Sequence, residues 1–224
     1  MKNRFLNLEK RRITYNFKSL MWQFAGYVGH IFFRKSPPRI KGSERVLINL
    51  GCGETFHKDW INADFYRLQN YIFKRHLRPN WMLDLTKPLK CESNFVDAVF
   101  MEHTNEHLLY SENYKLISEI YRILKEGGVL RICVPDLNKY LNWEVEKINS
   151  IKMARFSSLP EAISSLTQNH LHKSVWNAEL LIELLTELGF KQVYTSKFNS
   201  SKFDHLKIDD ISHEWESVYV EAIK

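Results

Sequence analysis

The chain is poor in cysteine, and the three cysteines that it has lie far apart. Cys52, Cys91 and Cys133 are odd in number and form no C-x-x-C pair. We therefore expect neither a disulfide framework nor a thiolate zinc site, and a reducing compartment fits. The 224 residues also lack a run of about 20 apolar residues, the length that a spanning helix requires. No A-x-A cleavage pattern indicates a signal peptide.

Positive charge is concentrated at the N-terminus and missing from the rest. Residues 1–45 hold eleven Lys and Arg against two Glu, a net charge of +9, whereas residues 46–224 hold 21 Lys and Arg against 24 acids, a net charge of −3. This asymmetry favours an anionic partner, which could be a membrane surface, a nucleic acid or a phosphorylated substrate. A solvated basic helix is the alternative interpretation.

An N-terminal extension over residues 1–43 is expected to be helical and amphipathic. Ser19–Phe33 contains no charged residue, and its apolar residues recur at helical spacing. One interpretation is a helix that packs on the body of the protein. The other is an interfacial membrane helix with Lys18, Arg34 and Lys35 at its ends. Peripheral membrane contact through residues 1–41 therefore stays open.

Residues 44–224 read as one domain in which strands and helices alternate. Two helices are expected, at 111–124 with Ser111 as N-cap and Gly127-Gly128 as stop, and at 180–188 closed by Gly189. The apolar runs predict strands at 46–50, 60–63, 81–83, 95–101, 129–134, 190–198 and 215–223. This order predicts an α/β fold of the Rossmann-like, doubly wound type, with a mostly parallel seven-stranded sheet and helices on both faces.

The segment 138–175 interrupts this alternation. It is polar, rich in serine, and contains His170 and His172. Insertions of this kind usually lie at the ligand end of a sheet. We therefore expect a substrate-side insertion, with a purely structural role as the alternative.

A glycine turn follows the first predicted strand. Gly51-Cys52-Gly53 directly follows Val46–Leu50, which favours a tight loop where backbone approaches a ligand. A G-x-G-x-x-G fingerprint is absent because Phe56 stands at its third glycine, and no Gly-Lys-Ser/Thr follows. A ligand with a ribose and without a pyrophosphate suits this loop better. Asp64, which closes the second strand, could accept hydrogen bonds from the ribose hydroxyls, and Asp84 could meet an adenine amine.

These pieces, in this order, resemble the class I S-adenosylmethionine-dependent methyltransferases. The resemblance covers residues 45–135 and rests on five segments: Leu50–Gly53, Trp60–Asp64, Asp84-Leu85, Phe95–His103 and Ile120–Arg131. Within that superfamily the chain looks most like the small methyltransferases associated with bacterial polysaccharide and cell-envelope biosynthesis. The turn at 134–137 and the closing strand at 215–222 carry this narrower likeness.

The resemblance implies a set of cofactor contacts. Gly51, Cys52 and Gly53 would contact the methionine part of S-adenosylmethionine through their backbone, and Asp64 would hold the ribose. The remaining positions implied around the adenine and the methyl-transfer site are Phe65, Asp84, Leu85, Glu102 and His103. One departure is Asn49, which stands where the family usually has an acid and is retained as a cofactor-side residue.

The histidines have two competing interpretations. His103-Thr104-Asn105-Glu106-His107 matches the zinc-protease pattern H-x-x-E-H, which needs a long helix around it. Here the pattern falls between a strand and a helix, in a loop or first helical turn, so we expect no metal. A hydroxyl acceptor needs its proton removed, and the candidates for that base are His103, His107, His170 and His172.

The sequence thus predicts an S-adenosylmethionine-dependent methyltransferase, acting on the oxygen of a saccharide, a sugar nucleotide or a lipid-linked glycan. We expect a cytoplasmic protein, with membrane association as an open possibility. Two alternatives remain: a binding module without turnover, and a nucleic-acid methyltransferase that uses the basic arm. The Asn/Asp-Pro-Pro-Tyr/Phe tetrapeptide of base-amino methylating families is absent, which disfavours nucleic acid. The sequence does not fix the oligomeric state.

Overall fold

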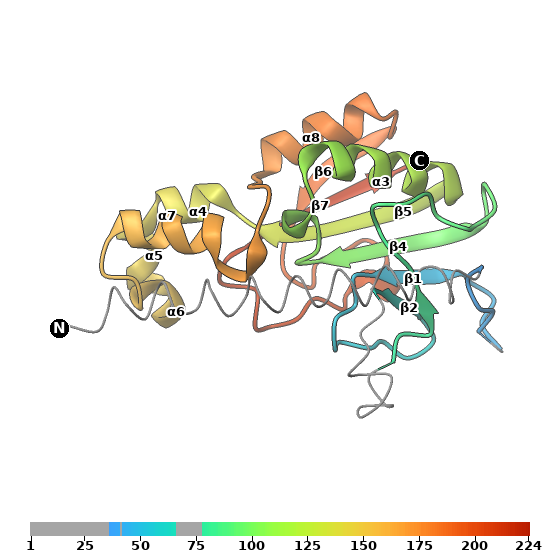
Figure 1. Cartoon of the computed structure of the whole chain (residues 1–224), viewed down its shortest axis with the longest axis horizontal. Coiled ribbons are helices and arrows are strands. Elements are labelled where there is room, and N and C mark those ends of the chain that lie inside the picture. The colour runs from blue at the N-terminus through green and yellow to red at the C-terminus, as the bar shows by residue number, and fades with distance from the viewer. Residues whose placement is uncertain (1–35, 41, 66–77) are drawn as a thin grey trace.

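The computed structural model describes residues 36–40, 42–65 and 78–224. These residues form a seven-stranded sheet with the strand order β3-β2-β1-β4-β5-β7-β6 (Figure 1). The strands are β1 (Leu47–Leu50), β2 (Ile61–Asp64), β3 (Trp81–Met82), β4 (Val96–Glu102), β5 (Leu124–Pro135), β6 (Gln192–Ser196) and β7 (Ser217–Ile223). Each strand expected from the sequence is present, and the prediction of a seven-stranded α/β sheet is confirmed.

The sheet is parallel except at one edge. β1 pairs in parallel with β2 and β4, and β4 pairs in parallel with β5. β7 runs antiparallel to both β5 and β6. The carboxyl ends of β1, β2, β4 and β5 therefore meet at one edge, where open α/β sheets bind their ligands.

The two expected helices are present, but the ends of the first differ from the prediction. α3 spans Tyr110–Ile123. Its N-terminus is closed by Glu112, whose carboxylate accepts from the Leu109 N–H at 2.8 Å, so Ser111 is not the N-cap. Gly127-Gly128 does not stop this helix either, since the chain already turns into β5 at Leu124. The glycines instead lie at a register shift between β4 and β5, and Gly127 has a φ of +74°.

The second helix matches the prediction closely. α8 spans Ala178–Glu187 and ends at Leu188, followed by Gly189 with a φ of +95°. The Asn177 side chain caps its N-terminus by accepting from the Leu180 N–H at 3.0 Å. A glycine with positive φ is the expected helix terminator.

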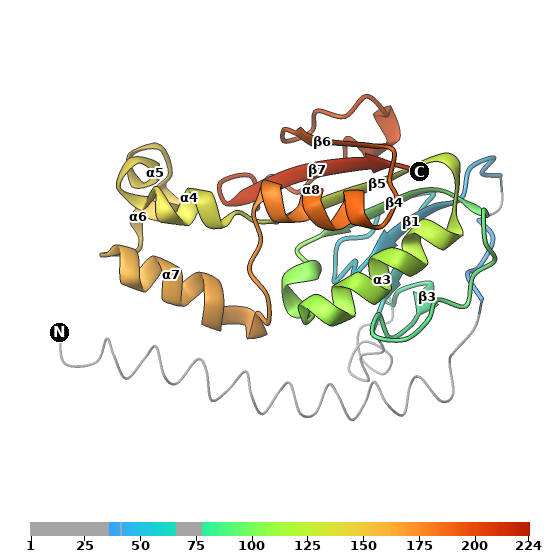
Figure 2. The ribbon, with the colours of Figure 1, turned by 90° about the horizontal axis from the view of Figure 1, so that it is seen from above.

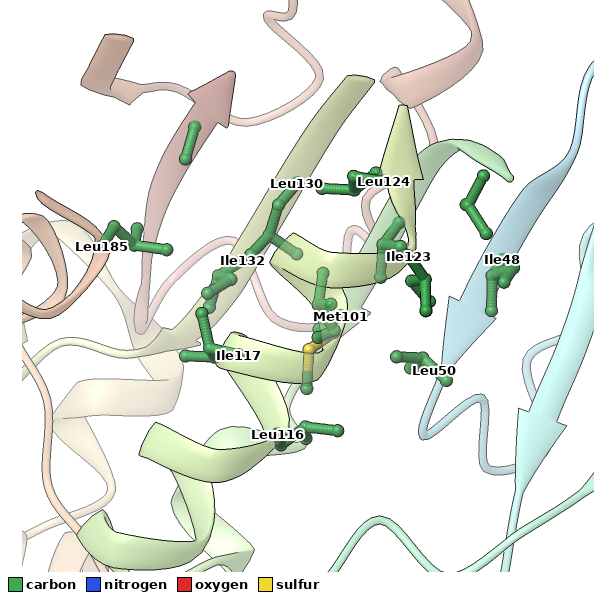
Figure 3. Packing of buried hydrophobic residues seen from close by; sticks show 14 of the residues in the cluster. Ile48, Leu50, Met101, Leu116, Ile117, Ile123, Leu124, Leu130, Ile132 and Leu185 are labelled. Atoms are coloured by element: carbon green, nitrogen blue, oxygen red, sulfur yellow. The ribbon is translucent and has the colours of Figure 1, made fainter. Parts of the chain in front are cut away.

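α3 and α8 lie on the same side of the sheet, as Figure 1 shows. Every second residue of β4 and β5 points to them, and together they form the main hydrophobic cluster (Figure 3). The residues that α3 and α8 contribute are Leu116, Ile117, Ile120, Ile123, Leu181 and Leu185. Burying such side chains contributes about 1.5–3 kcal/mol each, which fixes the sheet in register beneath the helices.

The opposite face of the sheet is covered in part by the chain between β6 and β7. Among the described residues, a non-helical segment from β6 to β7, containing only the short η4 (Asp204–Leu206), packs there. Its apolar residues Phe198, Phe203, Leu206 and Ile208 meet the alternate side chains of β4, β5 and β7. A buried ion-pair network holds this segment against the sheet.

Arg131 of β5 is the centre of that network. Its guanidinium is fully buried and donates to Asp209 (2.8 Å from Nε) and to Glu221 of β7 (2.6 Å from Nη1). A further bond at 2.9 Å reaches the Lys197 carbonyl, and Tyr194 donates to Glu221 at 2.8 Å. These contacts tie the 197–209 segment to β5 and β7.

A small helical unit follows β5. It consists of α4 (Leu137–Leu141), α5 (Trp143–Asn149), α6 (Ile151–Ala154) and α7 (Leu159–Gln168), followed by η3 (Asn169–Leu171). The unit has its own hydrophobic cluster, made of Tyr140, Trp143, Met153, Phe156, Ala162 and Leu166. Figures 1 and 2 show it beyond one end of the sheet. It coincides with the 138–175 segment and lies at the carboxyl end of β5, as a substrate-side insertion would.

The N-terminal extension at 1–43 lies almost wholly outside the described residues, and the amphipathic helix expected there stays a prediction. Within the described part of the chain, no helix is long and apolar enough to cross a bilayer.

Candidate active site

The glycine turn is positioned by backbone hydrogen bonds to β2. The N–H groups of Gly51 and Cys52 both donate to the Ala63 carbonyl, at 2.8 and 3.1 Å. Gly51 and Gly53 have φ angles of +74° and +56°, which favour glycine. A Cβ on Gly53 would meet no atom within 4 Å, whereas the Cys52 side chain is buried. Open space at Gly53 lets a ligand approach the backbone, as a sulfonium cofactor would require.

Asp64 stands directly beside this turn. Its carboxylate accepts from the Gly53 N–H at 2.6 Å and from the Phe65 N–H. Both Asp64 and Phe65 are partly exposed. A half-exposed carboxylate beside a glycine turn fits the expected ribose contact, and Phe65 lies next to it where the adenine is expected.

Asn49 has a structural task in the same region. It is buried, and its amide donates to the Thr55 carbonyl at 3.0 Å and to the Asn62 side chain at 3.2 Å. Asn62 in turn accepts from the His57 N–H at 2.9 Å. These bonds fix the loop between β1 and β2. A neutral amide serves here because its nitrogen donates both bonds, which the carboxylate usual in the family could not do.

Asp84 and Leu85 follow β3. The Asp84 carboxylate accepts from the Thr86 N–H at 2.9 Å and from its hydroxyl at 2.7 Å, which closes a turn. Leu85 packs against the main hydrophobic cluster. The cofactor roles assigned to these two residues stay predictions.

The segment after β4 backs onto the glycine turn. A Cβ on Gly51 would lie 2.1 Å from Oγ1 of Thr104, and that hydroxyl donates to the Leu50 carbonyl at 3.3 Å. Thr104 was part of a motif in the sequence, but nothing in that motif indicated that it faces Gly51. The contact brings the H-x-x-E-H segment to the cofactor side of the sheet.

His103 is the most enclosed of the candidate bases. It has a φ of +47°, its Nε2 lies 2.8 Å from the Ser217 hydroxyl, and its Nδ1 lies 3.3 Å from Glu106. Its ring stacks on His213 at 3.9 Å between centroids. Burial and the neighbouring histidines hold the pKa of His103 well below its ordinary value, so the ring is neutral at neutral pH. His213 was missed because its sequence neighbours carry no motif.

His107 and His172 meet although 65 positions separate them in the sequence. Their rings contact edge to face at 5.1 Å, and His170 lies 6.0 Å from His172. Burial first, and then His172 and His170, lower the pKa of His107 to about 3, and burial also lowers the pKa of His172. The structure therefore gathers the four histidine candidates, all beside or near Glu106. The residues from 103 to 107 lie in a bend and the short η2 (Asn105–His107), as expected, and not in a long helix.

Glu102 ends β4 on the face covered by the 197–209 segment. Its carboxylate accepts from the Asp210 N–H at 3.0 Å, and His213 lies 4.0 Å away. Burial, followed by the charges of Asp209 and Asp210, raises the pKa of Glu102 to about 7. The role predicted for Glu102, at the border of the methyl-transfer site, is not tested by these contacts.

The pKa of Glu102 makes stability depend on pH. Because it is raised in the folded state, the folded protein binds more protons than the unfolded chain between about pH 4.5 and 7. The free energy of unfolding should therefore fall as pH rises through this window. We expect Glu102→Gln to remove that part of the decline, so that the variant gains about 1–3 kcal/mol relative to wild type between pH 5 and pH 8.

Urea unfolding at several pH values measures this change, and Glu126→Gln is the matched control because Glu126 is an exposed partner of Lys191. An identical pH slope in wild type and Glu102→Gln would contradict the assignment.

Comparison with known proteins agrees with this geometry. Residues 48–132 match the model of a methyltransferase domain. No curated protein sequence matches the chain significantly. Among solved structures, a SAM-dependent methyltransferase from Archaeoglobus fulgidus is similar, with a TM-score of 0.52 and 18% identity over 88% of this chain and 99% of that chain.

Two further solved structures show similar coverage. A protein from Bordetella parapertussis has a TM-score of 0.51 and 14% identity, over 90% of this chain and 67% of that one. A SAM-dependent methyltransferase from Aquifex aeolicus has a TM-score of 0.47 and 16% identity, over 88% and 87%. Residues 48–132 thus match a methyltransferase domain, and the chain shares its fold and sheet order with a solved SAM-dependent methyltransferase.

Proposed function

We propose that the enzyme methylates a hydroxyl of a saccharide, a sugar nucleotide or a lipid-linked glycan. The observation that supports this most is the group of neutral histidines around Glu106, of which His103 directly precedes Thr104, the residue packed against the glycine turn. Burial lowers the pKa values of His103, His107 and His172, so each ring is uncharged at neutral pH and keeps a nitrogen lone pair that can accept a proton, while the low pKa of His107 makes it a weak base. A hydroxyl needs this help, whereas an amine or a thiolate needs less of it.

The helical unit α4–α7 supports an acceptor that is larger than a metabolite. It extends the ligand edge of the sheet beyond β5 (Figure 2). Its surface carries exposed apolar side chains at helical spacing, namely Leu141, Val145 and Ile148, with Ile151 on the next helix. Ile148 and Ile151 are 80% and 92% exposed. Exposed apolar patches of this kind usually mark a partner, and a lipid-linked acceptor at a membrane surface suits this one.

A nucleic-acid acceptor is the second candidate because of the +9 charge of residues 1–45. Single-stranded RNA would be drawn by that charge in a strongly salt-dependent way. The histidines favour the hydroxyl acceptor, and the following assay separates the two.

The test measures S-adenosylhomocysteine released from S-adenosylmethionine with three acceptors: a free oligosaccharide, the same saccharide on a lipid in vesicles, and RNA. We expect release with the saccharides and a higher rate with the lipid-linked form.

Asp64→Ala should raise the dissociation constant of the cofactor at least tenfold, about 1.4 kcal/mol, because the variant loses charged hydrogen bonds to the ribose. Asp204→Ala, which changes an exposed carboxylate, is the control.

Turnover on RNA alone would refute the saccharide assignment. Cofactor binding without turnover on any of the three would instead favour a binding module. Unchanged cofactor affinity in a folded Asp64→Ala variant would show that the ribose contact is misplaced.

A further inference from the structure

Glu106 is the least satisfied polar side chain of the candidate site. It is 2% exposed, and although Nδ1 of His103 lies 3.3 Å from one carboxylate oxygen, neither oxygen makes a hydrogen bond among the described residues. Buried polar groups are almost always hydrogen-bonded, and an unpaired buried carboxylate is strongly disfavoured. The side chain therefore requires either a proton or a cation that the protein chain itself does not supply.

Besides His103, the imidazoles of His107 and His172 lie close to this carboxylate. Ligand atoms of Glu106, His107 and His172 all lie within 4.8 Å of one another. The Nδ1 atom of His172 lies 2.6 Å from the Leu166 carbonyl, and because a carbonyl only accepts, this nitrogen carries the hydrogen. The Nε2 lone pair of His172 is thus left for a ligand. A backbone carbonyl that fixes the tautomer in this way is the usual outer contact of a metal-binding histidine.

The backbone holds the three residues together from two distant segments. The N–H groups of Lys173 and Ser174 both donate to the Glu106 carbonyl, at 2.7 and 3.2 Å. The Ser174 hydroxyl donates to the Asn105 carbonyl at 3.1 Å. His170 and Leu171, just before His172, both have positive φ angles. The arrangement therefore belongs to the folded backbone and does not depend on free side-chain rotation alone.

We propose that Glu106, His107 and His172 bind a divalent transition metal ion of the zinc type. Two imidazoles and one carboxylate form a donor set that catalytic zinc sites use, and that set leaves a fourth position open. The His107 side chain is 41% exposed, so an ion can reach this site from solvent. The ion would supply the positive charge that the buried carboxylate lacks.

This proposal changes the expectation of no metal drawn from the sequence. The H-x-x-E-H pattern suggested His103 and His107 as ligands on one helix, and no such helix forms. His172, from the end of the α4–α7 unit, instead takes the place that His103 has in that pattern. His103 turns one ring nitrogen to Ser217. Sequence spacing could not show this pairing because the two segments lie 65 residues apart.

A metal ion at this position would bind and polarise a hydroxyl of the acceptor, which lowers the pKa of that hydroxyl. That consequence rests on the proposed acceptor. The metal site itself does not depend on the acceptor, because its ligands are side chains of the protein.

The test uses the full chain after removal of metal with a chelator and dialysis. Calorimetric titration with ZnCl₂ and elemental analysis of the dialysed complex should give one ion per chain. Bound Co²⁺ should show visible d–d absorption. We expect His172→Ala and Glu106→Gln each to weaken Zn²⁺ binding at least tenfold, and the double variant at least 100-fold. His205→Ala, at a histidine that pairs with Arg45, should change nothing.

The absence of zinc binding to wild type, or equal affinity in wild type and the double variant, would overturn the proposal. In that case Glu106 is a buried protonated acid, and Glu106→Gln should fold at least as stably as wild type. Calorimetry with S-adenosylhomocysteine on the same samples keeps this result separate from the proposed function, because cofactor binding does not require the metal ion.

Discussion

Replacing Arg131 with methionine is expected to lower the free energy of unfolding by about 3–5 kcal/mol. The substitution removes the only guanidinium that the described residues place between Asp209 and Glu221, both of which are fully buried. Two carboxylates then remain inside the protein without their charge partner, which is far more costly than the loss of the pair itself. Urea unfolding followed by circular dichroism measures the change.

A triple variant separates the loss of charge pairing from a simple packing defect. The triple variant Arg131→Met, Asp209→Asn, Glu221→Gln removes all three charges, and we expect it to recover a large part of the lost stability. Lys191→Met, which breaks an exposed ion pair with Glu126, should cause no measurable change. A single variant as stable as wild type, or a triple variant no better than the single one, would contradict the role assigned to Arg131.

The second large effect is expected from Gly51→Ala, which should reduce cofactor affinity at least 100-fold. The new Cβ would lie 2.1 Å from Oγ1 and 2.5 Å from Cγ2 of Thr104, so the turn must move away from the segment after β4. The φ of +74° adds strain of about 1–2 kcal/mol for any residue with a Cβ. Calorimetry with S-adenosylhomocysteine and urea unfolding measure the two consequences separately.

Gly53→Ala is the matched comparison. Gly53 also has a positive φ, but a Cβ there meets no atom within 4 Å. The Gly53→Ala variant should therefore show the backbone strain of a positive φ, while the turn of the free protein keeps its position. Adding Thr104→Gly to Gly51→Ala removes the clash and should restore part of the affinity. If the two alanine variants behave alike, the contact between Gly51 and Thr104 is not what positions the turn.

The sequence was sufficient for the elements that carry their own periodicity. The apolar run before Gly51 predicted β1, and the leucines at 180–188 predicted α8 almost to its ends. The prediction failed for the N-cap and the stop of α3, because Glu112 can cap a helix as Ser111 can and only the fold decides between them. The chain between β6 and β7 looks polar in the sequence, yet Asp209 holds it on the sheet through Arg131. The sequence alone does not distinguish a buried aspartate from an exposed one.

In the candidate site, too, local features could be predicted from the sequence and contacts between distant segments could not. Residues that directly follow a strand, such as Gly51 and Asp64, could be placed at the ligand edge because parallel strands end together. His213 and Ser217 could not be placed relative to His103, nor His172 relative to His107, since these contacts join residues separated by 65 to 114 positions. A local sequence pattern carries no information about contacts between residues so far apart in the chain, so the arrangement of the histidines could be seen only in the structure.

The α4–α7 unit has a hydrophobic cluster separate from the clusters of the sheet. The turn and strands expected to hold the cofactor therefore do not share a core with the helices expected to meet the acceptor. Mutations that reshape the surface of these helices can accumulate without unfolding the nucleotide half. Selection for a new acceptor in this enzyme would be free to act on one compact module, and a chimera that exchanged residues 137–168 would inherit its donor chemistry intact.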